Sequence, residues 1–311
     1  MIQVEVTTRC NAKCEYCVNT YSANEKIDMS ISTFHNIVDM VQNLKTKNTW
    51  LLQGTGEPLL HKNLNDMIKH IKKYDHDSEI SIITNGILLT KPMFYKLINS
   101  GLTHIILSID DTESDFEKIR KGVSWEQILS VCDMIYTHNL FSNNKIKFGF
   151  STVAMKSNLD HLEKLMQFGK IYGVDHISIM PLVIIGNGIA STDNSIFTID
   201  SEILHQKLLY VQEKGKLIGI KISIPIVHMR EKLDILKRIN NHICSRIEGL
   251  YFDVNGYIAP CCMMSDDKSW GTVNSFNYDK YKNFINEWKY LKIIPHPCDK
   301  CIVSSSIVLE R

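Results

Sequence analysis

The sequence predicts an α/β fold in which parallel strands are joined by helical crossovers. Strand-like and helix-like segments alternate six times between residues 2 and 180, and the connections between them are short. Such alternation is typical of parallel sheets with right-handed crossovers. Six units are too few to close the usual eight-stranded barrel. The pattern changes near residue 225, so we expect a second, smaller module at the C-terminal end.

The first unit begins with a segment in which apolar and polar residues alternate. Residues 2–8 place three aliphatic side chains on one face and polar side chains on the other, which indicates a strand. Ser30 or Ser32 can cap a helix that continues to about Lys45, because apolar residues recur there at helical spacing. Further strands are expected at 49–53 and 79–84, and further helices near 63–74 and from about residue 91.

The remaining units repeat this order and lead into a region of different composition. Residues 181–199 are poor in charge and rich in Gly, Asn, Ser and Thr, which favours a loop. A helix near 201–213 and a strand-like segment at 218–224 then lead to the second module. We therefore divide the chain into a barrel region, 1–215, and a linker with the C-terminal module, 216–311. Strands are expected at 104–109, 145–153 and 175–180, and helices near 125–138 and 159–172.

Composition indicates a globular protein with neither nucleic acid nor membrane as a partner. Hydrophobic residues make up 44% and charged residues 22% of the 311 residues, and the formal net charge is +1. This balance lacks the basic surplus typical of nucleic-acid binding, and no apolar run reaches the roughly 20 residues of a spanning helix. No basic-then-apolar leader opens the sequence, so the nine cysteines are expected to be metal ligands in the cytoplasm rather than disulfides.

Three cysteines lie together directly after the first predicted strand. Cys10, Cys14 and Cys17 have the spacing C-x3-C-x2-C within eight residues. Thiolates are soft ligands that suit iron–sulfur clusters or zinc, and three of them leave one ligand position of a four-ligand site open. An iron–sulfur cluster with one open iron and half of a zinc site are both compatible with the residues alone.

The stretch resembles the cluster loop of the radical S-adenosylmethionine (SAM) enzymes. The resemblance implies a [4Fe–4S] cluster whose open iron chelates the amino and carboxylate groups of SAM, so that an electron from the cluster cleaves SAM to a 5′-deoxyadenosyl radical. It also implies an open, three-quarter (β/α)6 TIM-like barrel and an electron donor such as flavodoxin or ferredoxin. Tyr16, before the third cysteine, fits a position where family members often place a ring against the adenine.

A SAM pocket is expected at the ends of the strands, where barrels of this kind carry their chemistry. Residues 54–58 read Gly-Thr-Gly-Glu-Pro and resemble the family's Gly-Gly-Glu-Pro motif, with a threonine among the glycines. The backbone of this motif and its glutamate would hold the SAM ammonium group. The alternative for residues 54–58 is an ordinary strand-to-helix turn. For Asp110 and the neighbouring Asp111, which end a later strand, the alternative is a helix-capping role. The expected SAM contacts are Gly54, Thr55, Gly56, Glu57, Asn85, Ser108, Asp110, Ser151 and Met180.

Glu5 is a candidate substrate contact. It lies on the polar face of the first strand, whose apolar face should pack against helices, so its side chain is expected to point into the barrel. The alternative is an ion pair with an inward-facing lysine such as Lys147.

Four later cysteines indicate a second site. Cys244, Cys261, Cys298 and Cys301 end in a C-x2-C pair, and a glycine stands five residues before the second of them. The pattern resembles the twitch or shortened SPASM module, which holds an auxiliary [4Fe–4S] cluster, so two clusters are expected in all. Strand-like segments around an Asn-Gly pair at 255–256 predict a hairpin that carries Cys261 to this cluster. A zinc ribbon with four thiolates is the alternative.

Two cysteines are left over. Cys132 shares helical spacing with apolar residues and is expected to be a buried small side chain. Cys262 directly follows an expected ligand, and either neighbour could bind iron, although the spacing favours Cys261. In resemblance to some radical SAM epimerases, Cys262 is a candidate donor of a hydrogen atom to a substrate radical. A structural thiol or a fallback ligand is the alternative.

The resemblance extends over nearly the whole chain and implies an enzyme that abstracts hydrogen from an unactivated C–H bond. Electron transfer to the auxiliary cluster would give oxidation, as a dehydrogenation or a crosslink, whereas hydrogen return from Cys262 would give epimerisation. The substrate is expected to be a ribosomally made peptide or an aminocyclitol or sugar, and the early start of the cluster loop leaves no leader-binding segment before it. A non-catalytic iron–sulfur or zinc-binding scaffold is the alternative of another class.

Overall fold

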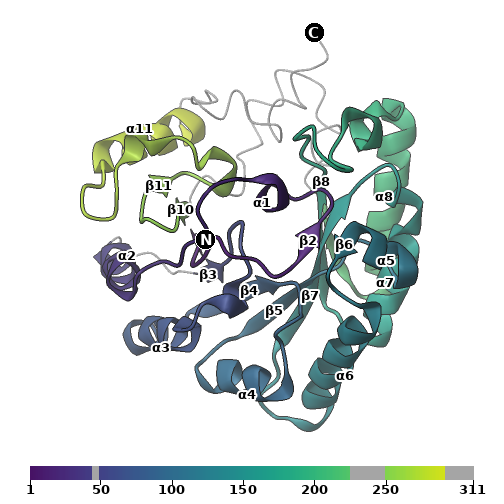
Figure 1. Ribbon diagram of the computed structural model, residues 1–311, viewed down its shortest axis with the longest axis horizontal. Helices are drawn as coiled ribbons and strands as arrows, with labels where there is room; N and C mark the ends of the chain where they lie inside the picture. The colour runs from purple at the N-terminus through teal and green to yellow at the C-terminus, as the bar shows by residue number, and fades with distance from the viewer. Residues whose placement is uncertain (44–48, 225–248, 291–311) are drawn as a thin grey trace.

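The fold is known from a computed structural model that describes residues 1–43, 49–224 and 249–290 (Figure 1). Its centre is one curved sheet of nine strands with helices along the outer side. All neighbouring strands are parallel except the last pair, β10 and β11. In spatial order the strands are β11 (Ile258–Ala259), β10 (Leu250–Phe252), β1 (Ile2–Val4), β3 (Thr49–Leu52), β4 (Glu79–Thr84), β5 (His104–Ser108), β7 (Lys147–Ala154), β8 (His176–Pro181) and β9 (Lys221–Ser223).

The helices follow the strands as the alternation predicts. Short 3-10 turns lie at Pro58–Leu60 (η1), Leu159–His161 (η2), Thr192–Asn194 (η3), Ile196–Thr198 (η4), Cys262–Met264 (η5) and Lys268–Trp270 (η6). The α-helices are α1 (Val18–Tyr21), α2 (Ile31–Asn43), α3 (Leu64–Tyr74), α4 (Lys91–Asn99), α5 (Glu113–Ile119), α6 (Trp125–Phe141), α7 (Leu162–Ile171), α8 (Ser201–Ile218) and α11 (Tyr278–Lys289). None of the helices in the described part of the chain is long and apolar enough to cross a membrane.

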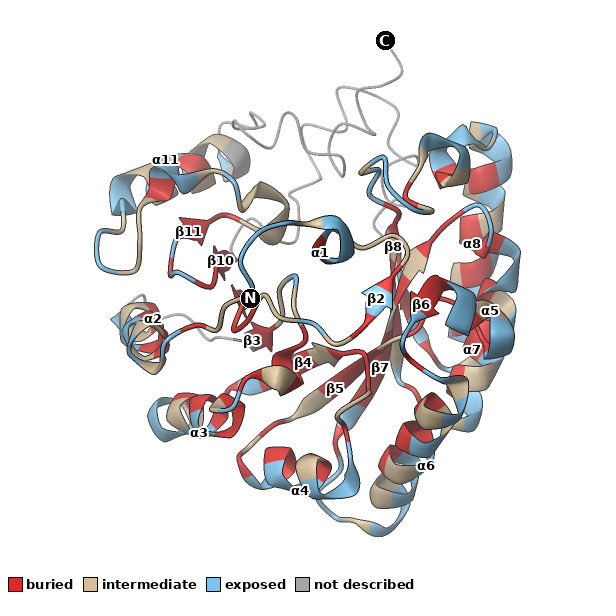
Figure 2. Ribbon diagram, viewed as in Figure 1, coloured by how far each residue is buried: buried red, intermediate tan, exposed pale blue. Residues whose placement is uncertain are grey.

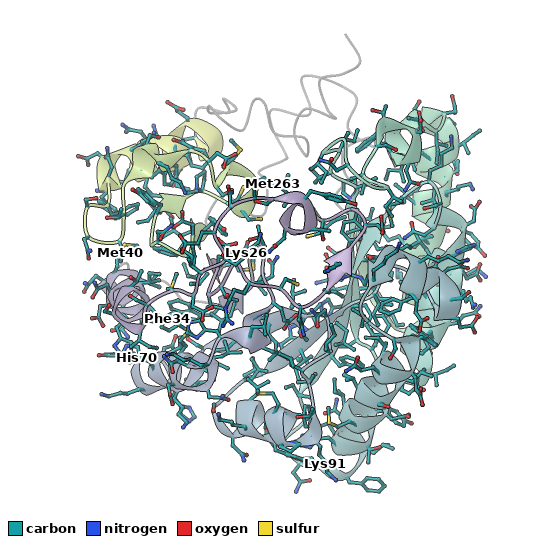
Figure 3. All side chains as sticks on the ribbon, viewed as in Figure 1. Lys26, Phe34, Met40, His70, Lys91 and Met263 are labelled. Atoms are coloured by element: carbon teal, nitrogen blue, oxygen red, sulfur yellow. The ribbon has the colours of Figure 1, made fainter. Side chains whose placement is uncertain are left out.

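The core lies between the outer face of the sheet and these helices (Figure 2). Alternate residues of the strands are buried, as in β4, where Ile80 and Ile82 have no exposed surface. The helices contribute a stripe at helical spacing, such as Phe34, Ile37 and Val41 of α2; Figure 3 shows the first of these. Each such side chain contributes about 1.5–3 kcal/mol when it leaves water. The opposite face of the sheet is therefore the one left for polar side chains.

The predicted α/β class with an open partial barrel is confirmed, and so are the six parallel strands of its sequence pattern. The helix predicted at Ser30 begins there, since its hydroxyl accepts the Thr33 amide at 3.0 Å; the stretch 44–48, where that helix was expected to end, lies outside the described residues. The first strand is shorter than the predicted 2–8. Beyond Val4 the chain turns toward residues 27–29, with a bridge from Thr7 to Asp28, and leaves the ladder.

The C-terminal part of the barrel extends further than the periodicity indicates. α8 continues through residue 215, the predicted end of the barrel region, and ends at the left-handed Gly219. β9 then pairs in parallel with β8, so the segment expected to lead out of the barrel belongs to its sheet. The predicted hairpin around residues 255–256 is present, and its first strand pairs with β1. The hairpin is therefore a continuation of the central sheet.

Candidate functional site

The loop that carries the first three cysteines crosses the open side of the sheet (Figure 1). It is fixed at its middle by a two-residue ladder, in which β2 (Lys13–Cys14) pairs antiparallel with β6 (Arg120–Lys121). Cys14 stands directly opposite Arg120 in this register. The ladder thereby brings a cation to the buried cysteine of the trio, although the two residues are far apart in sequence.

Arg120 is the centre of a buried polar network. Its Nη1 lies 3.8 Å from Cys14 Sγ, and its Nη2 donates to the Tyr16 hydroxyl at 2.6 Å. Its Nε lies 2.8 Å from Asp110 Oδ2, and the two side chains are 8% and 0% exposed. Asp110 also accepts the Val153 amide at 2.8 Å, so the carboxylate ties β7 to the guanidinium. Asp110 acts here as the partner of Arg120, which positions Tyr16 and Cys14.

Charges and burial perturb the groups of this network. Burial alone would lower the pKa of Arg120, but Asp110 and the neighbouring Tyr16 and Cys14 raise it above its ordinary value. The guanidinium is therefore a permanent cation. Burial raises the pKa of Cys14 to about 11 and that of Cys10 above its usual range.

Cys10 is held from the end of β4. Asn85 Nδ2 lies 3.9 Å from Cys10 Sγ and donates to Asn11 Oδ1 at 2.9 Å. Asn85 is itself fixed by Glu57, which accepts the Asn85 amide at 2.8 Å and the Thr84 hydroxyl at 2.7 Å. Burial raises the pKa of Glu57 to about 7, although these donors oppose the rise. Glu57 thus links the Gly-Thr-Gly-Glu-Pro turn to the next strand end.

The turn at 54–58 packs directly against the cysteine loop. A Cβ on Gly56 would lie 2.4 Å from the carbonyl oxygen of Thr7, and the Glu57 amide donates to the carbonyl of Arg9 at 2.8 Å. Asn19 Nδ2 bridges the two segments, since it donates to the carbonyls of Thr8 and Thr55, each at 2.7 Å. Only a glycine at position 56 permits this approach.

Glu5 supports the same turn. Its Oε1 accepts both the backbone amide and the hydroxyl of Thr55, each at 2.7 Å, and a Cβ on Gly54 would collide with the Glu5 side chain. The alternative pairing with Lys147 is wrong, because the Lys147 ammonium lies 2.5 Å from Glu79 at the other end of the strands. Glu5 is buried and points inward, as its place in the strand pattern indicates.

The residues of the loop fit an iron–sulfur cluster. The three thiols lie close enough that a negative charge on Cys17 raises the pKa of both Cys10 and Cys14. Ligand atoms of a single metal ion lie close together. In the described part of the chain, the groups whose ligand atoms all lie within 4.8 Å of one another do not include these three cysteines. Donors from Asn85 and Arg120 face two of the sulfurs, as expected for ligands that carry negative charge.

The other expected contacts lie on the uncovered face of the sheet. Ser108 pairs with Ser151, Ser151 with Ser178, and Ser178 with Ser223, so four serines form one row across β5, β7, β8 and β9. The first three are partly exposed, whereas the residues that precede them are buried. Met180 follows two residues beyond Ser178 at the carboxyl end of β8 and is also partly exposed. The row is a line of hydroxyls across the face of the sheet that the helices leave uncovered.

The hairpin brings Cys261 and Cys262 toward the same region. Burial raises the pKa of Tyr251 in β10, and the charges of Glu5 and Cys262 raise it further. Cys261 and Cys262 are partly exposed and not in disulfides. The other three expected ligands, Cys244, Cys298 and Cys301, lie outside the described residues.

Cys132 is buried within α6 without exposed surface, as predicted. Three residues of the site have no sequence motif that would reveal them: Arg120, Asn19 and Tyr251. The short Arg120–Lys121 strand lacks the length that periodicity needs. Arg120 also stands in a charged stretch, Glu117-Lys-Ile-Arg-Lys121, so its neighbours in sequence do not single it out.

Comparison with known proteins places the chain in a family. The sequence profile of the Radical SAM superfamily matches residues 4–169, just over half of the chain. A tungsten-containing aldehyde ferredoxin oxidoreductase cofactor-modifying protein of Pyrococcus furiosus is 27% identical over 187 residues, which cover 58% of this chain and 51% of that protein. A GTP 3',8-cyclase of Clostridium botulinum is 24% identical over 314 residues, 95% of this chain and 91% of the cyclase. The chain thus spans about half of the first relative's length.

Solved structures show the same fold at low identity. Native anSMEcpe with bound AdoMet and Cp18Cys peptide has a TM-score of 0.67 at 17% identity, covering 97% of this chain and 86% of that one. Streptococcus suis SuiB bound to the precursor peptide SuiA has a TM-score of 0.62 at 16% identity, covering 84% of this chain and 58% of that one. At such identities the likeness is one of fold alone.

Proposed function

Because this chain belongs to the radical SAM superfamily, we propose that it cleaves SAM reductively at a [4Fe–4S] cluster bound by Cys10, Cys14 and Cys17. When bound, the cluster supplies the electron that converts SAM to a 5′-deoxyadenosyl radical, which takes a hydrogen atom from a substrate C–H bond. The observation that carries the proposal is the convergence of the cysteine loop, the turn at 54–58 and the Asn85 strand end at the carboxyl ends of parallel strands.

The residues around the loop have distinct roles in this proposal. Asn85 and Arg120 donate toward the sulfurs of Cys10 and Cys14 and stabilise their negative charge. Arg120 also orients Tyr16, whose ring would contact the adenine. Asp110 holds Arg120 in place, and we assign it this positioning role.

The turn at 54–58 would bind the SAM ammonium group through its backbone. Glu5 and Glu57 brace the turn from two sides, by way of Thr55 and of the Thr84–Asn85 strand end. Both side chains are buried, and the negative charge of Glu5 would also favour a cationic sulfonium ligand nearby. Ser108, Ser151 and Met180 lie on the face of the sheet below and would contact SAM or the substrate.

We further propose an auxiliary [4Fe–4S] cluster bound by Cys261 together with Cys244, Cys298 and Cys301. The hairpin supports this proposal, because it ends next to Cys261 and extends the barrel sheet through β10. The Glu5 amide donates to the carbonyl of Phe252 in this hairpin at 2.9 Å, and this closeness would allow electrons to pass between the substrate and the second cluster. Iron and sulfide of about eight atoms each per chain, falling by half in Cys261→Ala, would support it; a zinc content of one per chain in place of the second cluster would refute it.

Anaerobic reconstitution tests the central proposal. Reduced protein with SAM should release 5′-deoxyadenosine, and Cys14→Ala should abolish both this product and the cluster iron of the N-terminal loop. Cys132→Ala is the matched control, since that thiol is buried in α6 away from the site. If wild-type protein forms no 5′-deoxyadenosine and its iron and sulfide stay near zero, the scaffold alternative is correct.

The serine row favours a substrate recognised by hydrogen bonds, such as an aminocyclitol, a sugar or the backbone of a peptide. The cyclase relatives suggest a nucleoside triphosphate as a second candidate. Against it, two arginines close to the cysteine loop are already paired with carboxylates: Arg9 with Asp28 and Arg120 with Asp110. Direct binding assays with GTP, an aminocyclitol and a short peptide would separate the three classes.

The outcome after hydrogen abstraction is the remaining choice. Cys262 and Glu5 both raise the pKa of Tyr251, and this shared neighbour supports Cys262 as a hydrogen-atom donor. Product formed in heavy water should then gain one deuterium, and Cys262→Ala should end this gain while 5′-deoxyadenosine still forms. Loss of hydrogens from the product without deuterium gain would instead support oxidation through the auxiliary cluster.

A further inference from the structure

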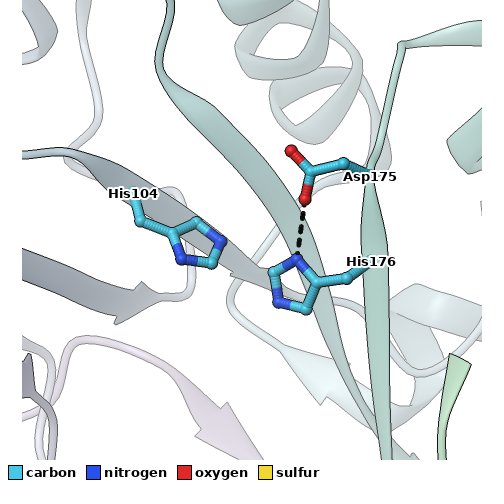
Figure 4. A group of neighbouring side chains, drawn as sticks. All are labelled: His104, Asp175 and His176. Carbon is cyan, nitrogen blue, oxygen red and sulfur yellow. Dashed lines mark hydrogen bonds and ion pairs between the residues drawn. The ribbon is translucent and has the colours of Figure 1, made fainter. Parts of the chain in front are cut away.

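Three side chains gather at the amino ends of two strands, away from the cysteine loop (Figure 4). His104 begins β5, His176 begins β8, and Asp175 directly precedes β8. The two imidazole rings have centroids 4.6 Å apart at 66°, and His176 Nδ1 lies 3.0 Å from Asp175 Oδ1. One ligand atom from each of the three residues lies within 4.8 Å of the other two.

The missing side chain of Gly149 makes this meeting possible. β7 runs between β5 and β8, and Gly149 pairs directly with His176 across the β7–β8 ladder. A Cβ on Gly149 would lie 1.9 Å from His176 Cε1, so any other residue would exclude the ring. The His176 ring therefore lies over the β7 backbone and reaches the neighbourhood of His104.

His104 has an unused nitrogen that is turned toward the other two residues. Its Nε2 is buried and has no hydrogen-bond partner among the described residues, whereas its Nδ1 lies 3.4 Å from Ser81 Oγ. Figure 4 shows a ring nitrogen of His104 facing Asp175 and His176. An unpaired buried polar atom costs about 1–3 kcal/mol, which a ligand at this position would remove.

The surroundings of His104, Asp175 and His176 are compatible with metal binding, which requires a neutral imidazole and a route for the ion. Burial, with His176 nearby, lowers the pKa of His104 to about 4, so its ring is neutral at physiological pH. Lys147, which stands opposite His104 in the β5–β7 ladder, is paired with Glu79 at 2.5 Å. Asp175 is 53% exposed, so an ion and its water ligands can enter from solvent.

We propose that His104, Asp175 and His176 bind a divalent transition-metal ion, with zinc as the preferred ion. Two imidazole nitrogens and one carboxylate oxygen are a common donor set for zinc sites that keep water in the fourth position. Ligand atoms at about 2.0–2.2 Å from a tetrahedral ion lie about 3.3–3.6 Å from one another. The observed group needs only small side-chain movements to reach this geometry, with the His176 proton carried on Nε2 when Nδ1 binds.

The ion would join β5 to β8 across β7 and brace the end of the barrel opposite the cysteine loop. This role is independent of SAM cleavage, because none of the three residues contacts the loop or the turn at 54–58 in the described interactions. An aromatic contact and a histidine–aspartate hydrogen bond, without any ion, are the competing explanation of the same geometry.

The test uses the full-length, cluster-loaded enzyme under anaerobic conditions. Protein is incubated with Zn²⁺, desalted, and analysed for zinc and iron by mass spectrometry. Wild-type chain should retain one more zinc per chain than His104→Asn or Asp175→Asn, at equal iron content. His35→Asn is the matched control, since His35 stacks on His70 between α2 and α3, outside the site. Equal zinc content in wild type and variants would overturn the proposal.

X-ray absorption at the zinc edge keeps the test decisive if a variant folds poorly. Zinc bound at the proposed site has only nitrogen and oxygen neighbours at about 2.0–2.2 Å, whereas zinc that has displaced iron at cysteines shows sulfur at about 2.3 Å. Gly149→Ala provides a further variant, because it should abolish zinc retention while all three ligands are present. A shell of sulfur alone in wild-type protein, without nitrogen or oxygen neighbours, or full zinc retention in Gly149→Ala, would refute the proposal.

Discussion

The ion pair of Asp110 and Arg120 allows a quantitative test of how the cysteine loop is held. Asp110→Asn preserves the shape of the side chain but leaves the Arg120 charge without its partner in a buried site. Breaking a buried pair in this way costs about 3–5 kcal/mol. For 311 residues the entropy of unfolding is about 0.65 kcal/mol/K, so the melting temperature should fall by about 5–8 °C.

Calorimetry of the cluster-loaded protein measures this shift, and iron analysis reports on the loop. Lys121→Met is the matched control, because Lys121 is the next residue of the same strand and its pair with Glu15 is exposed; its effect should stay below about 1 kcal/mol. Arg120→Met combined with Asp110→Asn should be less destabilising than the sum of the single changes, since no unpaired charge remains. The reasoning would be refuted if the melting temperature of Asp110→Asn fell as little as that of the Lys121→Met control. It would also be refuted if the destabilisation of the double variant equalled the sum of those of the single variants.

Three further predictions concern the turn, its brace and the far end of the barrel. Gly56→Ala should lower kcat/KM for SAM cleavage about 5- to 150-fold, because its Cβ would meet the Thr7 carbonyl; unchanged kinetics would show that the loop can move aside. Glu5→Gln should raise the KM for SAM about tenfold, since two charge-assisted hydrogen bonds to Thr55 become neutral; a change confined to the substrate KM would make Glu5 a substrate contact. Without zinc, the stability that neutral His104 contributes is present above pH 6.5 and is lost as the pH falls toward 4, because the unfolded chain takes up the proton first. Urea unfolding at pH 7 and pH 5 should therefore show a loss of unfolding free energy about 2 kcal/mol larger for wild type than for His104→Asn, and equal losses would contradict the lowered pKa of His104.

Local patterns predicted most of the fold and the parts of the site that lie in continuous motifs. The cysteine spacing, the glycine turn and the strand ends are properties of short segments, and they do converge in space. The inward direction of Glu5 follows from strand alternation in the same way. The alternative role of Glu5, an ion pair with Lys147, was wrong, because alternation gives the face of a strand and not the position along it. Lys147 pairs instead with Glu79 at the amino end of the strands.

Long-range pairings could not be predicted from these patterns. Arg120 reaches Cys14 through a two-residue ladder between segments 106 positions apart. β9 and β10 have only three residues each, which is too short for periodicity to say which strand they join. The zinc site has the same origin, since His104 and His176 meet only because Gly149 lies between them in register.

The place of β1 has a consequence for how the protein is made. β1 is flanked by β3 on one side and by β10 on the other. One edge of β1 therefore forms its backbone hydrogen bonds only when residues near 250 are present. During synthesis on the ribosome, the strand that leads into the cysteines stays half unpaired until most of the polypeptide has emerged. A cluster delivered to the nascent chain would therefore meet an incompletely folded binding site. Insertion of the cluster is expected to follow release of the chain from the ribosome.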